Sequence, residues 1–301
     1  MAADGSTKAI LYALFANGGI AVAKGWAAWY TNSSAMLAEC IHSLADCGNQ
    51  GLLLLGMKRS KQVPDENHPL GYGKAIYFWS FLVAILLFSM GGMFSIYEGV
   101  HKLQHDEMPN APWVAVAVLA TAILLESGSL LGALVEVNKI KGRRTFWRWF
   151  RESRQGELVV VVGEDLAALL GLVLALAAVL LTIITGNPVF DALGTIAIGA
   201  VLIVVAVAVA IEVKGMLIGE SADPELQARL QDFLASRPEV AEIYRVLTLQ
   251  MGRDVMLSVK ARMAETGSAL KLVDDINAVE AALRRAFPEV RWMFFEPDRR
   301  D

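Results

Sequence analysis

One stripe of polar residues lies in a stretch that is otherwise rich in Leu, Ala, Gly and Met. Glu39, His42, Asp46 and Asn49 follow one another at offsets of three, four and three residues, which places all four on one side of an α-helix. A carboxylate near the centre of a bilayer costs roughly 2.5–3.5 kcal/mol. Two carboxylates and an imidazole in such a helix therefore need a compensating partner, which a divalent cation or protons would provide.

Metal binding is one chemistry that this stripe allows, because imidazole nitrogen and carboxylate oxygen are both zinc ligands and zinc prefers four of them. His42 and Asp46 lie one helical turn apart and supply two, so a second helix must contribute the rest. Another apolar run contains adjacent acids, Glu164 and Asp165. Neighbouring side chains point about 100° apart on a helix, so we expect only one acid to face the stripe. The candidate ligands are His42, Asp46, Glu164 and Asp165, followed by Glu39 and Asn49.

Each of these polar groups also has an alternative interpretation. His42 and Asp46 would also suit an interhelical hydrogen-bonding pair. Glu39 is compatible with three roles, namely carrying protons, orienting His42 and lining the outer mouth of a pathway. Lys24 and Glu126, which lie in two other apolar runs, are expected to form a buried ion pair.

The composition indicates a membrane protein. The chain has 301 residues, of which 55% are hydrophobic and 19% charged, whereas soluble domains carry about 25% charged residues. The net charge of −4 and the lack of a basic, aromatic-rich stretch argue against a nucleic-acid partner. Cys40 and Cys47 lie on one expected helix, so they do not form a disulfide with each other. The first apolar run is too long for a cleavable signal peptide.

Six apolar runs are each near the ~20 residues that a bilayer requires, at residues 9–30, 34–56, 76–100, 112–137, 158–185 and 188–213. Lys and Arg gather in the loops after the second and fourth runs, whereas the opposite loops carry only Lys102. By the positive-inside rule, both basic loops and both termini face the cytoplasm. Trp147 and Trp149, set among arginines, are expected to anchor a loop at the interface, where Arg-rich stretches contact anionic membrane lipid. We predict an integral multi-pass protein of a bacterial inner membrane.

The pattern changes after residue 213. Residues 223–237 and 268–286 are expected helices with one apolar face, and residues 243–251, 255–263 and 290–295 are expected strands. The order αββαβ predicts a small α+β domain with its helices on one face of a three-stranded sheet. We expect a transmembrane domain at residues 1–213, a linker at 214–222 and a cytoplasmic domain at 223–301.

Three motifs carry a resemblance to a known family. They are His42-x-x-x-Asp46, residues 68–74 (His-Pro-Leu-Gly-Tyr-Gly-Lys) and residues 217–221 (Leu-Ile-Gly-Glu-Ser). With these motifs the chain resembles the cation diffusion facilitators, a family of proton-coupled divalent metal transporters, over nearly its whole length. The resemblance implies an all-α six-helix transmembrane bundle, a ferredoxin-like or metallochaperone-like α+β domain, and a homodimer.

The fifth apolar run departs from the usual family pattern. A second His-x-x-x-Asp motif is common there, and Glu164 and Ala168 take its places in this chain, with Asp165 beside the first. A branch of the family that includes a mitochondrial zinc transporter is similar in having Glu-Asp followed by Ala-Ala. The resemblance therefore favours Glu164 as the ligand, with Asp165 or Glu39 as a substitute for the missing aspartate.

Two other metal sites of the family are less well matched. Some relatives bind an ion in the loop before the third helix, where Asp65 and His68 match two ligands but Tyr72 replaces a needed histidine. Many relatives bind zinc in the tail through histidines, and this tail has neither His nor Cys. We therefore expect no zinc site in the C-terminal domain.

These features predict a divalent metal cation/proton antiporter that exports zinc from the cytoplasm, with zinc as the transported substrate and no organic cofactor. Metal binding requires deprotonated His and carboxylate groups, so protons compete with the metal. Cobalt, nickel, iron and manganese are alternative substrates. A non-transporting membrane scaffold or sensor is the alternative from another functional class. An intramembrane enzyme is disfavoured because no nucleophile lies in a recognisable catalytic motif.

Overall fold

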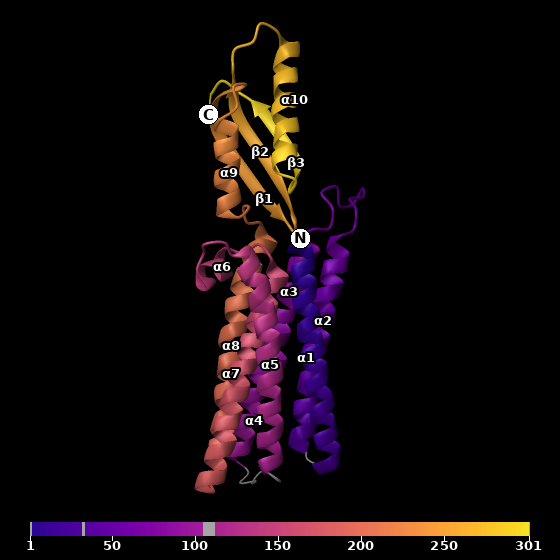
Figure 1. The fold of residues 1–301 in the computed structure, drawn as a ribbon, viewed down its shortest axis with the longest axis vertical. Helices are drawn as coiled ribbons and strands as arrows, with labels where there is room; N and C mark the ends of the chain where they lie inside the picture. Colours follow the sequence, from indigo (N-terminus) through magenta and orange to yellow (C-terminus); the bar gives the residue numbers. More distant parts are fainter. Residues whose placement is uncertain (1, 32–33, 105–111, 301) are drawn as a thin grey trace.

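Long helices and a small sheet domain occupy opposite ends of the computed structural model, which describes residues 2–31, 34–104 and 112–300 (Figure 1). In the first two helices, the side chains of residues 2–9, 27–28, 30–31, 34–42 and 45 lie outside this description. The elements of the bundle are α1 (Ala2–Thr31), α2 (Ser34–Ser60), α3 (Ala75–Leu86), η1 (Leu87–Met93), α4 (Phe94–Leu103), α5 (Pro112–Ile140), α6 (Phe146–Glu152), α7 (Gly156–Thr185) and α8 (Val189–Ile218).

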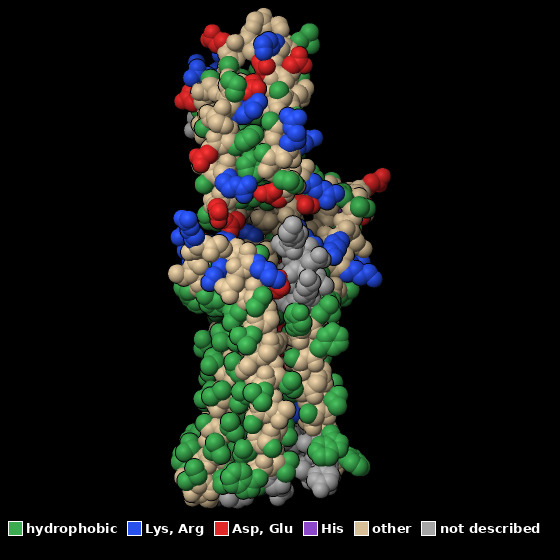
Figure 2. Space-filling model, in the orientation of Figure 1, with side chains coloured by type: hydrophobic (Ala, Val, Ile, Leu, Met, Phe, Trp, Pro, Cys, Tyr) green, Lys and Arg blue, Asp and Glu red, His purple; other side chains and the backbone are tan. Residues whose placement is uncertain are grey.

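Four helical rods among the described residues are long and apolar enough to cross a membrane, which confirms a helical transmembrane domain. They are Ala75–Leu103, Pro112–Ile140, Gly156–Thr185 and Val189–Ile218. Hydrophobic side chains cover much of the bundle surface, whereas charged side chains gather over the junction and the sheet domain (Figure 2). Helices α1 and α2 run alongside these rods and contact α5 and α3, respectively (Figure 1). Six spans stay a prediction.

The third expected span is not a uniform α-helix, because a π-helical segment, η1, joins α3 to α4. This segment packs closely against α8. A Cβ atom on Gly199 of α8 would lie 2.7 Å from the carbonyl oxygen of Gly92, and one on Gly92 would lie 2.5 Å from the side chain of Ile203. Only glycine allows the two backbones to approach this closely, and the contact fixes the third rod against α8.

A short helix that the sequence analysis did not expect, α6, lies in the basic loop between α5 and α7 and projects sideways from the bundle (Figure 1). The side chain of Thr145 caps its N-terminus. The predicted interfacial role is wrong for Trp149, which is 1% exposed in the bundle core, while Trp147 is 62% exposed. Positions two residues apart on a helix point about 200° apart, so the two indoles face opposite sides.

The C-terminal domain has the predicted order αββαβ, with α9 (Pro224–Ala235), β1 (Val240–Met251), β2 (Asp254–Met263), α10 (Ala269–Ala286) and β3 (Val290–Pro297). Strand β2 is central, antiparallel to β1 and parallel to β3. Gly252, with a φ of +76°, makes the turn between β1 and β2. Asp223 and Ser268 cap the two helices with their side-chain oxygens. A small three-stranded α/β domain is thereby confirmed.

The core of this domain comes from alternation along β2. Residues 255, 257, 259 and 261 are at most 1% exposed, while the residues between them are more exposed. Leu230 and Leu234 of α9 and Val279 and Leu283 of α10 belong to the same buried cluster. Both helices therefore cover one face of the sheet, as the sequence analysis predicted.

A short junction joins the two regions, because α8 continues to Ile218, five residues beyond the expected end of the last span. Arg154 Nη1 lies 2.6 Å from Glu220 Oε2, and Arg144 forms an ion pair with Asp223. The turn between β1 and β2 contacts the loop before α3 so closely that a Cβ on Gly73 would lie 2.0 Å from the Met251 carbonyl oxygen. This contact explains one glycine of the His-Pro-Leu-Gly-Tyr-Gly-Lys motif.

Candidate metal site

The predicted polar stripe belongs to helix α2, which contains residues 39, 42, 46 and 49. The side chains of Glu39 and His42 lie outside the described residues. Asp46 is half-buried and Asn49 is 6% exposed. The C-terminal half of the stripe is therefore wholly or partly buried in the bundle, on the part of α2 that contacts α7.

Glu164 of α7 is the acid that contacts α2. Its side chain is 3% exposed, and each of its carboxylate oxygens accepts one amide hydrogen bond. Asn49 Nδ2 donates to Oε1 at 3.0 Å, and Gln50 Nε2 donates to Oε2 at 3.1 Å. The charge of Asp46 also acts on Glu164. Glu164 thus lies beside the two described residues of the predicted stripe.

Asp165 points toward a different helix. It is 1% exposed, and its Oδ2 accepts a hydrogen bond from the Ser129 hydroxyl of α5 at 2.8 Å. The adjacent acids therefore have hydrogen-bond partners on two different helices, as their angular separation on α7 requires. Asp165 is nevertheless within electrostatic range of Asp46. The structure thus brings Asp46, Glu164 and Asp165 into one electrostatically connected region.

Two polar residues that the sequence analysis did not assign to the site belong to this region. Gln50 is fully buried beside Asn49, and Asn17 of α1 donates to its Oε1 at 3.3 Å. The signal for Gln50 was a second amide directly after Asn49 in an apolar run, but it lies off the stripe defined by three- and four-residue offsets. Its role depends on the position of α7, which the spacing within α2 does not reveal.

Glu126 of α5 also faces the acidic region. It is 4% exposed, and its Oε2 has no hydrogen-bond partner among the described residues. The charges of Asp165, Asp46 and Lys24 all act on it. Lys24 is itself 4% exposed. Lys24 and Glu126 therefore interact electrostatically. A direct ion pair between them stays a prediction.

Carboxylate and amide oxygens can serve as ligands for a divalent cation. An ionised carboxylate has about four lone-pair positions, so Glu164 retains acceptor capacity beyond its two amide donors. Among the side chains that the structure describes, which exclude His42, no three His, Cys, Asp or Glu groups are close enough to hold one ion. The ligand set of His42, Asp46, Glu164 and Asp165, with Glu39 and Asn49 as further members, therefore stays a prediction.

The loop before α3 is organised around Asp65. The Tyr72 hydroxyl donates to Asp65 Oδ2 at 2.6 Å, and the His68 backbone N–H donates to Oδ1 at 2.7 Å. These hydrogen bonds, with that of Tyr72 the stronger influence, lower the pKa of Asp65 below its ordinary value. Tyr72, at the position where the resemblance predicts a histidine, thus donates to Asp65, one of the two ligands that the resemblance suggested for this loop.

Comparison with known proteins gives matches over most of the chain. Residues 10–218 match the cation efflux transmembrane domain. The mitochondrial proton-coupled zinc antiporter SLC30A9 of Mus musculus is 37% identical over 82% of the chain, and metal tolerance protein C4 of Arabidopsis thaliana is 32% identical over 79%. The chain spans 44% and 53% of those two proteins. The cation-efflux pump FieF of Escherichia coli O127:H6 is 26% identical over 88% of the chain and 83% of its own length.

Proposed function

The chain belongs to the cation efflux family, and we propose that it is a divalent metal cation/proton antiporter that exports zinc from the cytoplasm by alternating access. The match to the cation efflux domain and the similarity to a proton-coupled zinc antiporter indicate a transporter and not an enzyme. Zinc as the substrate is supported by the name of the mouse relative, a proton-coupled zinc antiporter. The observation that carries the proposal is the buried Glu164 carboxylate, which connects α7 to the polar stripe of α2 inside the membrane domain.

The proposed site divides the work between two helices. His42 and Asp46 of α2 bind the ion, and Glu164 of α7 binds it from the neighbouring helix. Asp165 or Glu39 is a further carboxylate ligand in the coordination shell. Each of these groups binds a metal only when deprotonated, so zinc and protons compete for them. A site that opens alternately to the two sides of the membrane would then exchange an outgoing zinc ion for incoming protons.

The topology is part of the proposal. Helices α1 and α2 complete six spans with the four apolar rods, and the basic loops place both termini and the C-terminal domain in the cytoplasm. Figure 2 supports this orientation, because basic side chains gather at the end of the bundle next to the sheet domain. The bacterial inner membrane stays a prediction that the mitochondrial name of the mouse relative does not support.

A homodimer is supported by the uncovered face of the sheet. Ser258 of β2 pairs with Leu247 of β1 and with Phe294 of β3, so these three residues form a row across the sheet. The row lies on the face opposite the buried residues of β2. Leu247 and Phe294 are 56% and 55% exposed, and exposed apolar groups of this kind favour burial against a partner. A second copy of the chain is the proposed occupant.

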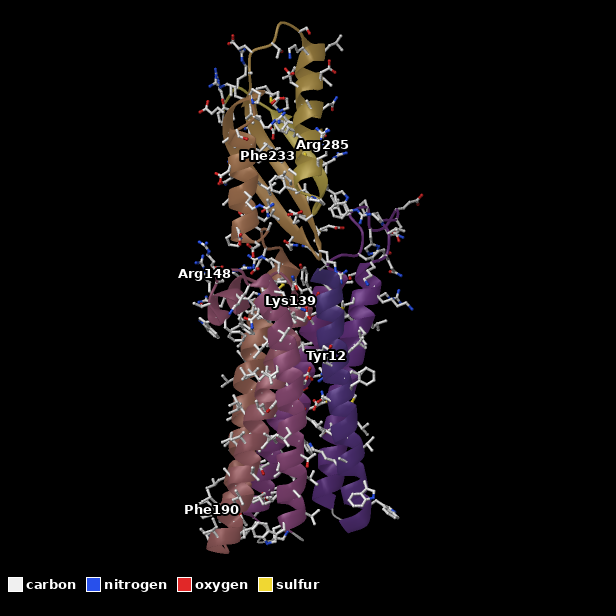
Figure 3. The ribbon with its side chains drawn as sticks, in the orientation of Figure 1. Tyr12, Lys139, Arg148, Phe190, Phe233 and Arg285 are labelled. Atoms are coloured by element: carbon white, nitrogen blue, oxygen red, sulfur yellow. The ribbon has the colours of Figure 1, made fainter. Side chains whose placement is uncertain are left out.

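Contact with anionic lipid is supported by helix α6. Trp147 is exposed at the boundary between the apolar bundle and the charged junction, the level at which tryptophan partitions in membranes. Arg148 points outward from the same helix (Figure 3). Arg143 and Arg148 border a cavity of about 640 Å³ beside the junction, together with acidic residues that include Glu152 and Asp223. Guanidinium groups at this level attract phosphate headgroups.

Zinc uptake into proteoliposomes under an imposed pH gradient tests the proposal. We expect the wild type to accumulate zinc and to move protons in the opposite direction. His42→Ala and Asp46→Ala should abolish both fluxes, whereas Asp232→Ala, at an exposed acid of α9, should leave them unchanged.

Two outcomes would contradict the proposal in different ways. Normal flux in both site variants would remove the assigned ligands but leave the transporter. No flux of zinc, cobalt, nickel, iron or manganese in the wild type would favour the scaffold or sensor, in which the hydrogen bonds between α2 and α7 only hold the bundle together.

A further inference from the structure

A chain of buried hydrogen bonds connects three helices to the carboxylate of Glu164. Asn17 Nδ2 of α1 donates to Gln50 Oε1 of α2 at 3.3 Å, and Gln50 Nε2 donates to Glu164 Oε2 of α7 at 3.1 Å. Asn17, Gln50 and Glu164 are 4%, 0% and 3% exposed. Glutamine suits this place because its side chain accepts from one neighbour while donating to the next.

The two oxygens of Glu164 are held by different partners. Asn49 donates to Oε1 and Gln50 donates to Oε2. Because each oxygen has its own donor, the orientation of the carboxylate is fixed. Asn49 lies on the predicted stripe and is itself a candidate ligand. Gln50 lies off the stripe and holds its acceptor oxygen toward Asn17, so its contribution to a metal site passes through Glu164.

We propose that Gln50, oriented by Asn17, is a positioning residue that aims the Glu164 carboxylate at the metal and thereby raises the zinc affinity of the site. This inference rests on the proposed function. Carboxylates that bind metals are commonly held by hydrogen bonds from residues that do not touch the ion, and losing such a partner costs about 10–100-fold in metal affinity. An unheld glutamate side chain would have to be ordered by the metal itself.

Isothermal titration of the full-length protein with zinc chloride tests this proposal through a double-mutant cycle. Gln50→Met preserves the length of the side chain and removes both hydrogen bonds, and we expect its zinc Kd to rise about tenfold or more. Asn17→Ala should raise the Kd by a smaller factor. In the double variant, Asn17→Ala should add nothing to Gln50→Met, because Asn17 acts through Gln50.

A matched control is the other buried glutamine. Gln250 donates to the Gly252 carbonyl oxygen at 2.8 Å in the C-terminal domain. Gln250→Met makes the same chemical change there, and we expect the zinc Kd to match that of the wild type. In proteoliposomes, Gln50→Met should raise the KM for zinc much more than it lowers kcat, a pattern that general loss of folded protein would not produce.

The outcomes separate this proposal from the proposed function. Zinc binding by the wild type with an unchanged or lower Kd in Gln50→Met overturns the positioning role alone. Fully additive effects of Asn17→Ala and Gln50→Met overturn the connection through Gln50. If Gln50→Met does not fold, an unchanged zinc Kd in Asn17→Ala is sufficient to reject the proposed effect of Asn17 through Gln50. A wild type that binds no zinc overturns both proposals.

Discussion

The helix bundle and the C-terminal domain accommodate polar groups in opposite ways. Among the described residues, the buried charged side chains all lie in the bundle or its loops, and they are Lys24, Glu126, Glu136, Glu157, Glu164 and Asp165. The C-terminal domain has a buried core of apolar residues and keeps its charges at the surface, in pairs such as Lys271–Asp275 and Arg262–Glu242. Among the described residues of the C-terminal domain, Gln250 is the one buried polar side chain.

This difference indicates where the chemistry lies. Surface ion pairs contribute little to stability, commonly about 0–1 kcal/mol, so the charges of the C-terminal domain are compatible with a domain stabilised by its apolar core. A buried charge is costly unless it is compensated, and acids inside a membrane are expected to have a function. The bundle therefore contains the candidate site, whereas the described part of the C-terminal domain has an apolar core without buried charges.

The largest expected effect is at Glu164. Glu164→Gln keeps the shape of the side chain but removes its charge. We expect zinc affinity to fall by more than about a hundredfold, which exceeds the loss expected when a residue that only supports a ligand is removed. Glu136→Gln is the matched control, because Glu136 is also buried in the bundle but pairs with Lys139 at 2.6 Å. Titration with zinc chloride measures both. Equal affinities in the two variants would show that bundle acids are not functionally distinct.

The C-terminal core should respond in stability and not in zinc binding. Leu283 of α10 is fully buried, so Leu283→Ala is expected to destabilise the domain by about 2–5 kcal/mol. Leu270→Ala, at a residue of the same helix that is 80% exposed, should change stability by less than about 0.5 kcal/mol. Hydrogen exchange of β2 in the full-length protein reports both changes. A large loss of zinc affinity in Leu283→Ala would contradict the division between the two regions.

The contact between the regions should be weaker than either core. In Gly73→Ala the new methyl group would collide with the Met251 carbonyl oxygen, at an expected cost of about 1–3 kcal/mol. Displacement of the turn should accelerate tryptic cleavage after Arg253, which is exposed beside Gly252. Gly267→Ala, where the structure leaves open space, is the control. Unaltered cleavage in Gly73→Ala would mean that the turn accommodates a side chain without moving.

The smallest expected effect is in the loop before α3. Tyr72→Phe removes the hydroxyl donor, so the pKa of Asp65 should rise toward its ordinary value. Because the folded-state pKa is lowered, the contribution of Asp65 to stability is present above its ordinary pKa and disappears as the pH falls through the lowered value. Titration of ¹³C-labelled aspartate by NMR measures the change, with Asp65→Asn to identify the signal. Tyr97→Phe should leave that signal unchanged.

The C-terminal domain was predictable almost element by element, because its signals are local. Alternation along residues 255–263 identified the second strand, and the apolar faces of residues 223–237 and 268–286 identified the two helices, which begin at Pro224 and Ala269. The short helix α6 was missed because its seven residues lie in a loop rich in arginine, where the positive charge dominated the interpretation. Burial of Trp149 depends on a contact with the bundle that no spacing within the loop encodes.

The site shows the same division between local and long-range information. Residue types and helical periodicity determined that α2 carries a polar stripe and that adjacent acids on α7 point in different directions, because both follow from 3.6 residues per turn. Periodicity left open which acid meets α2, and the resemblance only favoured Glu164. The packing of α1, α2, α5 and α7 placed Glu164 against α2 and Gln50 beside it. Periodicity describes one helix at a time, whereas a hydrogen bond between residues 50 and 164 exists only once the helices have been placed side by side.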